Sequence, residues 1–515
     1  MGPVYNKWYM EDGGIIGNVD MLQKVWDLLA TEGPKVGLHL NPSKCEWSWL
    51  DSSCSAPCPI RVGAGRQEDQ ISFVPTGEIQ MLGVPLGCCS KVSEYVGKKL
   101  FSRLKAMVDR LADFDDSQSA FFLLRVSFSI VRATHFMRTT PLAQWTEEAA
   151  EFDSVLRRAA EGILGFPFSD QCYAQAGLTP RLGGLGLRRI SDHANIAFTA
   201  SWYESKSTCE ENWAIRDDLG PATDQKSGSF KKDKQILNRL IDEAPNHRER
   251  QRLRRLECEH SGAWVSALPS ILDGKDTVMR PRNFRVAAAV RLGVPVLKRE
   301  VECSLCKQTV DVLGDHAACC AKTSDLVHRH NRLRNLIDKI CTEGNLSPVM
   351  EKKGILGDTP GRRPGDVSVP LWAGNKGLAI DVAVTSPFAS HNISVENPCE
   401  KYAETRKHRK YDAGFVASNY DFVAVVFETT GGLNEQGLRV LRQLFRFAAK
   451  QENTQLSVYC GRAWARLSCN LQSSVSQAIL NRVEGSPVVC DEGSSDEHVE
   501  QFDSYDLQGL SEDNL

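Results

Sequence analysis

Two acidic residues between positions 361 and 411 are of the kind found in sites that hydrolyse phosphodiester bonds. Asp366 opens the segment DVSVP and Asp381 lies within LAIDVAV, and both segments are rich in residues that favour β-strands. Two carboxylates on neighbouring strands can hold a hard divalent cation such as Mg²⁺, which lowers the pKa of a bound water and neutralises charge on a phosphate. The pattern therefore predicts a metal-dependent phosphodiesterase site at Asp366 and Asp381.

A helix rich in Lys and Arg is expected after the second strand, in AETRKHRKY. Glu404, Lys407 and Tyr411 share one face of such a helix, and Lys410 lies beside that face. A lysine here can stabilise the negative charge that develops on a phosphate, and Lys407 and Lys410 are both candidates. The alternative interpretation is structural: two strand-end aspartates and a solvated basic helix.

A second group of chemistry-bearing residues precedes this segment. Its members are thiol and imidazole side chains at metal-ligand spacing, namely Cys303, Cys306, His316 and Cys320. Cys-x2-Cys followed by His-x3-Cys suits tetrahedral Zn²⁺ and clamps a loop too short to have its own core. Cys319, His328 and His330 are further candidates, so the fourth ligand stays open. The alternative is a chance grouping of buried cysteines.

Composition is that of a soluble protein, with 42% hydrophobic and 25% charged residues among 515. This length suffices for roughly two to four domains with their own cores. The net charge of −3 hides a split, because residues 491–515 hold nine acidic residues and no Lys or Arg, which leaves the other 490 at +6. The basic residues of this body are clustered, which favours nucleic acid as a partner.

The compartment is expected to be intracellular. The N-terminus MGPVYNKWYMEDGG is polar and carries no secretory signal, and the apolar run AFFLLRVSFSIV contains Arg125 and is too short to span a bilayer. Seventeen cysteines without an export signal favour a reducing compartment. We therefore expect a nuclear or cytoplasmic protein that is neither secreted nor bound to a membrane.

The elements that must position these residues follow from periodicity. Trp8–Gly17, WYMEDGGIIG, predicts a β-hairpin with acids at its turn, and residues 92–220 have the three- and four-residue apolar spacing of helices. Residues 224–259 predict a mobile linker and a basic helix, which is either solvated or a phosphate-contacting strap. Beyond residue 327, an α-β-β-β-α-β order predicts a small mixed sheet flanked by helices.

The C-terminal half resembles the restriction-like (PD-(D/E)xK-type) endonuclease of the older, site-specific non-LTR retrotransposons, which nick DNA and prime reverse transcription from the nick. The resemblance implies that Asp366 and Asp381 are the metal ligands, Lys407 or Lys410 the catalytic lysine, and Tyr411 the helix tyrosine. The same elements carry a zinc knuckle directly before their endonuclease.

Two departures from that pattern concern the strands. The first motif is Pro-Gly-Asp, with Gly365 where the family has Pro-Asp, and Ala383 stands two residues after the second acid, where many such enzymes have lysine. The family moves this lysine to the following helix, which this chain supplies. Glu351, before the first strand, is a weaker candidate for assisting the metal.

The N-terminal part resembles the end of a reverse-transcriptase palm, from a Tyr-x-Asp-Asp-like hairpin to MLGVPLG at Met81–Gly87. By this resemblance Glu11 and Asp12 occupy the positions of two aspartates, and Lys44 that of the late palm lysine. Polymerase activity is not expected, because Glu11 is longer than aspartate and the third metal-binding aspartate would lie before Met1. A partner chain would have to supply the missing part.

The expected fold class is thus multidomain α+β, with a partial palm, a helical thumb, a small zinc knuckle and an α/β restriction-endonuclease-like domain. The expected regions are 1–91 (end of the palm), 92–223 (helical thumb-like region), 224–300 (basic linker and helices), 301–345 (zinc knuckle and basic helix), 346–484 (endonuclease) and 485–515 (acidic disordered tail).

The expected function is metal-dependent DNA nicking for target-primed reverse transcription. Mg²⁺ in the endonuclease site and Zn²⁺ in the knuckle are the implied cofactors, and DNA and RNA the implied partners. The alternative is a non-catalytic nucleic-acid-binding protein, derived from a decayed element, that uses only the knuckle and the basic helices.

Overall fold

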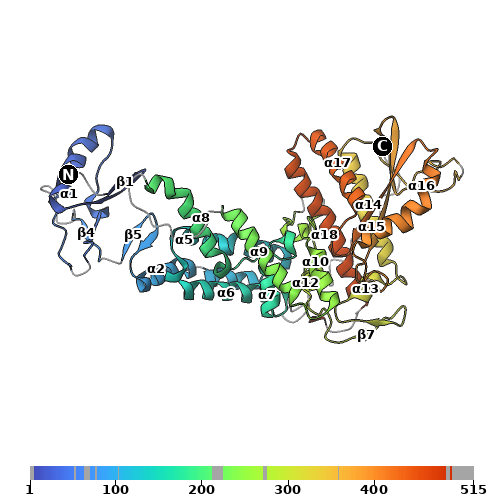
Figure 1. Ribbon diagram of the computed structural model, residues 1–515, viewed down its shortest axis with the longest axis horizontal. Coiled ribbons are helices and arrows are strands. Elements are labelled where there is room, and N and C mark those ends of the chain that lie inside the picture. Colours follow the sequence, from blue (N-terminus) through green and yellow to red (C-terminus); the bar gives the residue numbers. More distant parts are fainter. Residues whose placement is uncertain are drawn as a thin grey trace, which may run out of the picture. The chain divides into compact units, whose positions relative to one another are not determined.

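The structure, a computed structural model, is mixed α+β, and the general fold class expected from the sequence is therefore confirmed (Figure 1). It describes residues 5–51, 54–62, 70–75, 78–102, 104–210, 224–270, 275–357, 359–482 and 488–489. The acidic tail expected at 485–515 lies outside the described residues, apart from Val488 and Val489.

The chain forms two compact units. The first comprises Met1–Lys105, Ile130–Val155 and Arg189–Ser229, and the second Ala106–Ser129, Leu156–Arg188 and Phe230–Leu515. Elements of the first unit are β1 (Tyr5–Tyr9), β2 (Asp12–Ile16), α1 (Val19–Glu32), η1 (Gly33–Val36), η2 (Pro42–Lys44), β3 (Glu46–Trp47), β4 (Ser72–Phe73), β5 (Ile79–Met81), β6 (Val84–Leu86), α2 (Cys89–Phe101), η4 (Ile130–Arg132), α5 (Thr134–Thr139), η5 (Leu142–Gln144) and α8 (Ile190–Glu210).

Local capping explains how two helices of the first unit begin. Asn18 precedes α1 and accepts a hydrogen bond of 2.9 Å from the backbone N–H of Met21. The buried carboxylate of Asp153 accepts from the backbone N–H groups of Ile190 and Ser191 at the start of α8, at 2.8 and 3.1 Å. Both carboxylate and amide oxygens satisfy N–H groups that a helix leaves without partners at its N-terminus.

The second unit contains most of the helices and one larger sheet. Its elements are α4 (Ser117–Leu123), η3 (Leu124–Phe128), α7 (Asp170–Gly177), η6 (Pro180–Leu182), α9 (Gln225–Asp242), α10 (His247–Leu256), α11 (Ala263–Ser266), α12 (Pro281–Leu292), β7 (Val301–Glu302), β8 (Thr309–Val310), α13 (Asp315–Cys319), α14 (Asp325–Glu343), β9 (Val349–Met350), β10 (Val367–Ala373), β11 (Lys376–Thr385), α15 (Pro398–Tyr402), η7 (Ala403–His408), α16 (Arg409–Phe415), β12 (Tyr420–Glu428), α17 (Glu435–Gln451) and α18 (Leu456–Arg482). Three helices are divided between the units: α9, whose residues up to Ser229 belong to the first unit, and two further helices, α3 (Leu104–Ala112) and α6 (Thr146–Leu164).

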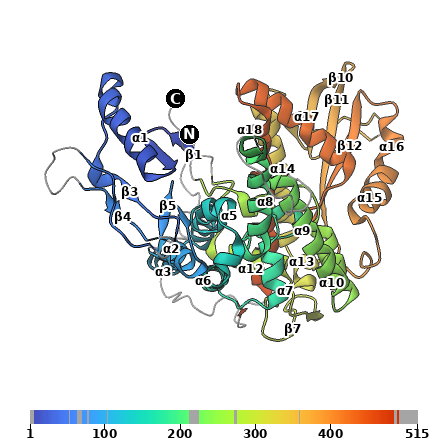
Figure 2. The same cartoon turned by 60° about the vertical axis from the view of Figure 1, so that its left-hand side comes forward.

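The larger sheet has the strand order β12-β11-β10-β9. β11 pairs parallel with β12 and antiparallel with β10, and β10 pairs antiparallel with β9. α14 and α17 lie on one side of this sheet, and α15 and α16 on the other (Figures 1 and 2). This agrees with the α-β-β-β-α-β order read from the sequence, and the central strands are buried on both faces, as their apolar runs require.

Alternation along the strands decides which residues face which helices. Ala379 and Ala383 of β11 pack with Phe422 of β12. They also pack with Ala403 of η7 and Phe415 of α16, the helical segments that follow α15. Because side chains two residues apart share a strand face, residue 381 also faces these helices. The α15–α16 side of the sheet is therefore the side on which the second acidic residue lies.

In the segment after residue 224, the expected basic helix is present as α10, but the expected mobile linker before it is wrong, because that stretch forms a packed helix, α9. Ser229 and Asp233 of α9 are buried, and Asp233 accepts a hydrogen bond of 2.7 Å from the guanidinium of Arg188. In α10, Arg252 is only 2% exposed and donates to the side chain of Gln175 at 2.8 Å. The polar composition suggested solvent exposure, but the ion pair of Asp233 and the hydrogen bond of Arg252 hold these two side chains inside the protein.

The apolar run Ser117–Thr139 is long and apolar enough to cross a membrane by length and composition, although the sequence suggested that its core was too short. It is divided into α4, a π-helical turn at η3, η4 and α5, and 39% of its most apolar window is buried in the protein. A single run of this kind is weak evidence for a membrane span, because core helices of soluble proteins pass the same test of length and composition.

Candidate active site and metal centre

Of the two sequence-predicted acids, Asp381 lies in β11 and Asp366 directly precedes the adjacent strand β10. Val367 pairs with Ile380 at one end of the antiparallel register of β10 and β11. Asp366 comes one residue before Val367, and Asp381 comes one residue after Ile380. Gly365, next to the first acid, is buried against β11, where an added Cβ would lie 3.1 Å from the Cβ of Ala379. The glycine of the Pro-Gly-Asp motif thus allows the chain to approach β11 closely.

Asp366 is fixed by contacts from two directions. Its Oδ2 accepts a hydrogen bond of 2.6 Å from the backbone N–H of Val382, the residue after the second acid. Its Oδ1 lies 3.2 Å from Nε2 of His330, which projects from α14. Its backbone N–H donates to the carbonyl of Ile380, so the first acid is tied to the strand that bears the second.

Asp381 is a buried carboxylate on an otherwise apolar strand. Its residue exposure is 7%, and its Oδ2 forms an ion pair with Nζ of Lys407. Burial raises the pKa of Asp381, the cation of Lys407 opposes that rise, and the carboxylate of Asp366 adds to it. Burial also disfavours the charged form of Lys407, yet the neighbouring carboxylate of Asp381 raises the pKa of this lysine overall. The pair is therefore held by its mutual attraction in a partly desolvated setting.

The helix after β11 orients Lys407 toward the sheet. Lys407 lies in η7, a π-helical turn between α15 and α16, and such turns are frequent at functional sites. Lys407 follows the buried Ala403 by four residues on the side that faces Asp381. Of the two candidate lysines, the structure thus places Lys407 at the carboxylates.

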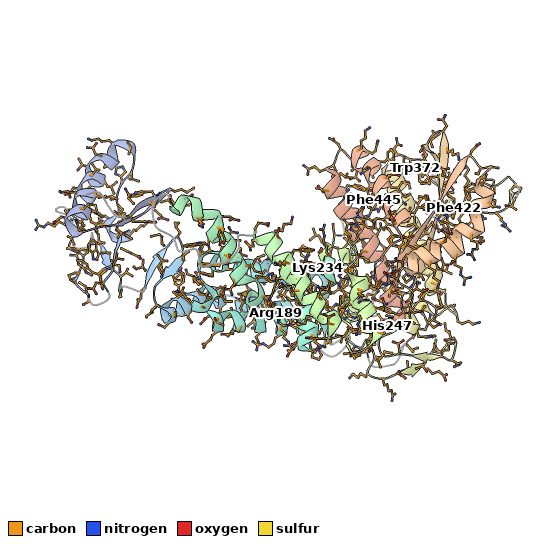
Figure 3. The ribbon with its side chains drawn as sticks, viewed as in Figure 1. Arg189, Lys234, His247, Trp372, Phe422 and Phe445 are labelled. Carbon is orange, nitrogen blue, oxygen red and sulfur yellow. The ribbon has the colours of Figure 1, made fainter. Side chains whose placement is uncertain are left out.

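The other helix residues named from the sequence lie elsewhere. Lys410 is exposed and its ammonium group sits 4.6 Å from the ring centroid of Tyr411, and Glu404 is also exposed. Phe422 of β12 is labelled in Figure 3. Tyr411 packs against Phe422 with ring centroids 5.3 Å apart, and Phe415 contacts the same ring at 5.0 Å. Tyr411 therefore belongs to the aromatic packing under the helix, and Lys410 and Glu404 do not join the acids.

Glu351, the weaker candidate, is committed to two arginines. Its Oε1 lies 2.7 Å from the guanidinium of Arg334 in α14, and its Oε2 pairs with Arg363. Its backbone N–H donates to the carbonyl of Asp366 at 2.9 Å. Glu351 thus ties α14 to the segment before β10, and its carboxylate is already neutralised by two cations.

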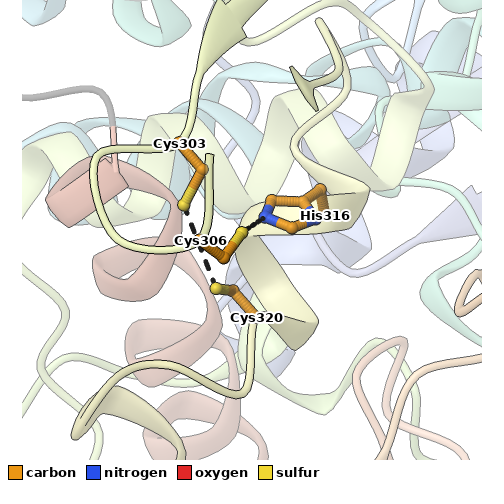
Figure 4. Close-up of side chains that lie close together, drawn as sticks. All are labelled: Cys303, Cys306, His316 and Cys320. Carbon is orange, nitrogen blue, oxygen red and sulfur yellow. Dashed lines mark hydrogen bonds between the residues drawn. The ribbon is translucent and has the colours of Figure 1, made fainter. Parts of the chain in front are cut away.

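The zinc-type residues form a compact cluster, with four ligand atoms within 4.8 Å of one another (Figure 4). Sγ of Cys303 lies 3.9 Å from Sγ of Cys320, and Sγ of Cys306 lies 3.1 Å from Nε2 of His316. With zinc–sulfur distances of about 2.3 Å, two sulfurs on one tetrahedral ion lie about 3.8 Å apart. The donor set and its spacing fit a zinc ion.

The loops around this cluster are shaped for metal binding. Cys303 and Cys306 flank a tight turn after β7, in which Lys307 has a left-handed φ of 63° and donates its N–H to the carbonyl of Cys303. Burial opposes ionisation of Cys303, but the backbone N–H groups of Cys306 and Leu305 lower its pKa to about 6. Zinc binds the thiolate, so a cysteine that ionises readily is suited to be its ligand.

The three spare ligand candidates do not lie in the cluster. Sγ of Cys319 donates to the backbone carbonyl of Asp315, and burial raises its pKa to about 11. His328 is exposed on α14, and His330 contacts Asp366 instead. The hypothesis that His330 is a zinc ligand is therefore wrong, because α14 places its side chain beside Asp366 at the sheet.

The palm-like residues lie in the first unit. Glu11 and Asp12 are exposed at the turn of the β1–β2 hairpin, where Tyr9 pairs with Asp12, and Lys44 is exposed in η2. The expected hairpin is present, with its acids at the turn. Nothing in this geometry gathers the two acids into a buried site.

No family model matches the chain, and no curated protein matches it. Two residue groups bear chemistry that can indicate a function, the zinc-type cluster and the Asp366–Asp381–Lys407 site.

The contact of His330 with Asp366 was not predicted from the sequence. His330 lies in VHRHNRLRNLIDKIC, where its type and proximity to the cysteines suggested zinc. The helical period could have indicated this contact. His330 precedes Arg334 by four residues, so the two side chains share one face of the helix. Both contact the segments around β9 and β10.

Proposed function

We propose that this chain is a metal-dependent endonuclease that nicks DNA, as part of a non-LTR retrotransposon protein that primes reverse transcription from the nick. The observation that carries the proposal is the convergence of Asp366, Asp381 and Lys407 from two adjacent strands and the following helix. DNA is the proposed substrate, and RNA the proposed template partner.

Carboxylate oxygens are the donors that a hard divalent cation prefers. A carboxylate on a buried apolar strand is costly unless it has a partner or a metal, and Asp381 lies beside a second carboxylate, that of Asp366. Mg²⁺ held by these two residues would lower the pKa of bound water and neutralise charge on the phosphate. The ion pair with Lys407 uses Oδ2 of Asp381, and a carboxylate has a second oxygen for other partners.

The protein's own groups perform the remaining tasks. The N–H of Val382 fixes Asp366, so that the two carboxylates keep their relative orientation without a rotamer search. Lys407 supplies a positive charge beside them, where the attack of water on phosphorus and the departure of the leaving oxygen build negative charge. Partial burial strengthens that interaction relative to water.

The zinc cluster supports this site through neighbouring contacts. Asp315, adjacent to the ligand His316, accepts two hydrogen bonds from Arg248 at 2.8 and 2.6 Å. The same guanidinium lies 4.3 Å from the ring centroid of Phe388, in the loop after β11. We therefore assign the zinc a structural role, in which it fixes α13 and thereby the position of Arg248.

A nicking assay on supercoiled plasmid with Mg²⁺ tests the proposal. The wild-type chain should convert supercoiled to open-circular DNA, and Asp366→Asn and Asp381→Asn should each abolish the conversion. Asp421→Asn is the matched control, because Asp421 is an exposed carboxylate on the neighbouring strand β12, paired with Lys376. Equal nicking by wild type and both active-site variants would end the proposal.

The rival function, nucleic-acid binding without catalysis, makes a different forecast in the same assay. It expects salt-sensitive DNA binding, no nicking, and no effect of either aspartate substitution on binding. Primer extension by the isolated chain should fail in both cases, because the exposed Glu11 and Asp12 do not form an enclosed metal site.

A further inference from the structure

We propose that the second unit holds one unpaired pyrimidine base of a DNA strand in a cavity beside α17 and α18. The lining of this cavity includes none of the residues of the Asp366–Asp381–Lys407 site. The choice of DNA as the ligand rests on the proposed nuclease function. Three features of the cavity favour a base: its apolar wall and size, the polar atoms in that wall, and a row of cations at its rim.

The cavity has a volume of about 170 Å³ and lies between β12, α17, α18 and the loop after α10. Its apolar wall consists of Phe427, Leu433, Leu438, Trp464, Leu467 and Leu471. An apolar cavity of about 150 Å³ is large enough to bind benzene. The space therefore accommodates a single six-membered ring, which among nucleobases is a pyrimidine.

The imidazole of His260 and the indole of Trp464 form a flat aromatic surface in the cavity wall. Their ring centroids lie 3.9 Å apart and the two rings are 10° from parallel. Phe445, which is labelled in Figure 3, packs nearly perpendicular to the indole at 5.1 Å and so holds it in place. Unpaired bases bind aromatic side chains by stacking, and this surface suits that contact.

Two polar side chains in the wall can bind the edge of a base. Nε2 of His260 is buried without a hydrogen-bond partner among the described residues, and burial lowers the pKa of this imidazole to about 4. The neutral ring has one donor and one acceptor nitrogen. The hydroxyl oxygen of Ser468 accepts a hydrogen bond of 3.2 Å from the backbone N–H of Trp264, so its O–H can still donate. Pyrimidines carry carbonyl and amino groups that match these atoms.

A row of exposed cations on α17 reaches the rim of the cavity. Its members follow one another by three or four positions and so share one face of the helix, namely Arg439, Arg442, Arg446 and Lys450. Arg442 forms an ion pair with Glu259, a residue of the cavity wall whose side chain is 48% exposed. Arginine binds phosphate through charge-assisted hydrogen bonds. The row therefore favours a nucleotide strand over an uncharged small molecule as the occupant.

The simpler interpretation is a gap in the packing that binds nothing. The two interpretations differ in what a larger side chain in the cavity would do. Filling a packing gap would leave DNA binding unchanged, whereas filling a base site would remove the part of the affinity that depends on the base.

Binding of short single-stranded DNA to the full chain tests the inference, with zinc kept saturating and without added Mg²⁺ or Mn²⁺. One probe is an oligothymidylate of roughly eight nucleotides, within the site sizes of single-strand-binding folds. The matched probe has the same phosphates but an abasic sugar at every position. We expect the thymidylate to bind at least about 5-fold more tightly, the lower end of what one stacked base contributes.

Two further probes sharpen this comparison. Added salt should weaken binding of the thymidylate and the abasic strand alike, because both carry the same charge, so the preference should persist. An oligoadenylate of the same length should bind less tightly than the thymidylate, because a purine has two rings. A preference for adenylate would overturn the assignment of a pyrimidine.

Leu438→Phe, which adds a ring to the cavity wall, should lower the affinity for thymidylate to that for the abasic strand. Leu456→Phe is the matched control, because Leu456 is an exposed leucine of α18 outside the cavity lining, and it should keep the preference. Equal binding of the two probes by the wild type, or a preference that Leu438→Phe leaves intact, overturns the inference.

Photocrosslinking locates the base in the wild type, so a misfolded variant cannot obscure the result. A thymidylate probe that carries one 5-iodouracil should crosslink to the peptide of His260 or that of Trp464, as mapped by mass spectrometry. Crosslinks confined to other peptides would overturn the assignment of the cavity.

Failure of the inference is distinguishable from failure of the proposed function. A chain that nicks plasmid but binds both probes equally is an endonuclease without a base site in this cavity. A chain that prefers thymidylate through this cavity but does not nick DNA holds a strand without cutting it.

Discussion

Lys407 and Asp381 form an ion pair at the centre of the larger sheet, on the face that Ala379 and Ala383 of the same strand also line. The pairing joins a π-helical turn to a buried strand, and it distinguishes Lys407 from Lys410, three residues later. A positive charge placed beside two carboxylates is what a phosphate-cleaving site requires, and several experiments follow from it.

Lys407→Ala should reduce plasmid nicking by about 100-fold or more, the typical loss when one group that stabilises the transition-state charge is removed. Lys410→Ala, on the same helix, should leave nicking within a few-fold of wild type, because Lys410 is exposed and its ammonium group lies over the ring of Tyr411. Initial rates at saturating Mg²⁺ or Mn²⁺ measure the difference. Equal losses in the two variants would mean that general DNA affinity, not site geometry, explains the effect.

Gly365→Ala should destabilise the protein by about 1–3 kcal/mol, because its Cβ would lie 3.1 Å from the Cβ of Ala379 in a packed region. The displacement should also separate Asp366 from the N–H of Val382 and lower nicking. Gly361→Ala is the matched control, since no atom lies within 4 Å of a Cβ placed there. Urea unfolding of both variants measures the cost, and a neutral Gly365→Ala variant would contradict the close packing.

Asp381→Asn should change the pH dependence of stability. Because burial raises the pKa of Asp381, the folded protein keeps this proton at pH values where the unfolded chain has released it. The stability contributed by protonated Asp381 is therefore fully present below the ordinary pKa of aspartate. It is lost as the pH rises through the higher pKa that Asp381 has in the folded protein. Asparagine cannot ionise, so the variant does not lose this stability. Its free energy of unfolding should therefore rise relative to that of the wild type as the pH increases from about 4 to 7.

Urea unfolding at several pH values, without added divalent cation, measures this trend. Asp421→Asn should show no comparable trend, because Asp421 is half exposed. A difference between Asp381→Asn and wild type that stays constant with pH would refute the assignment of a raised pKa.

Cys306→Ser should remove about one zinc per chain and lower the melting temperature, since the residues around the cluster depend on the metal for their packing. Cys319→Ser should keep its zinc, because Cys319 bonds to the carbonyl of Asp315 outside the cluster. Mass spectrometry of the intact protein under native conditions measures the metal content. Retention of zinc by Cys306→Ser would exclude Cys306 as a ligand.

The sequence by itself determined the features that depend on short spacing. The Cys-x2-Cys and His-x3-Cys pairs needed only one turn and one short helix to meet, and the strands around Asp366 and Asp381 followed from their apolar patterns. The hairpin that carries Glu11 and Asp12 also formed where its glycines indicated. Local backbone preferences act within a few residues, so such elements can be read without knowledge of the fold.

Only the tertiary structure decided which distant side chains meet. His330 contacts Asp366, 36 residues away, because α14 packs along the sheet, and a metal-ligand residue type could not indicate which of two centres it joined. The arginines of α10 looked solvated from composition, but Arg252 is enclosed by partners from α7 and α12. The choice of Lys407 over Lys410 likewise depends on the π-helical turn, which rotates one lysine toward a buried carboxylate that attracts it.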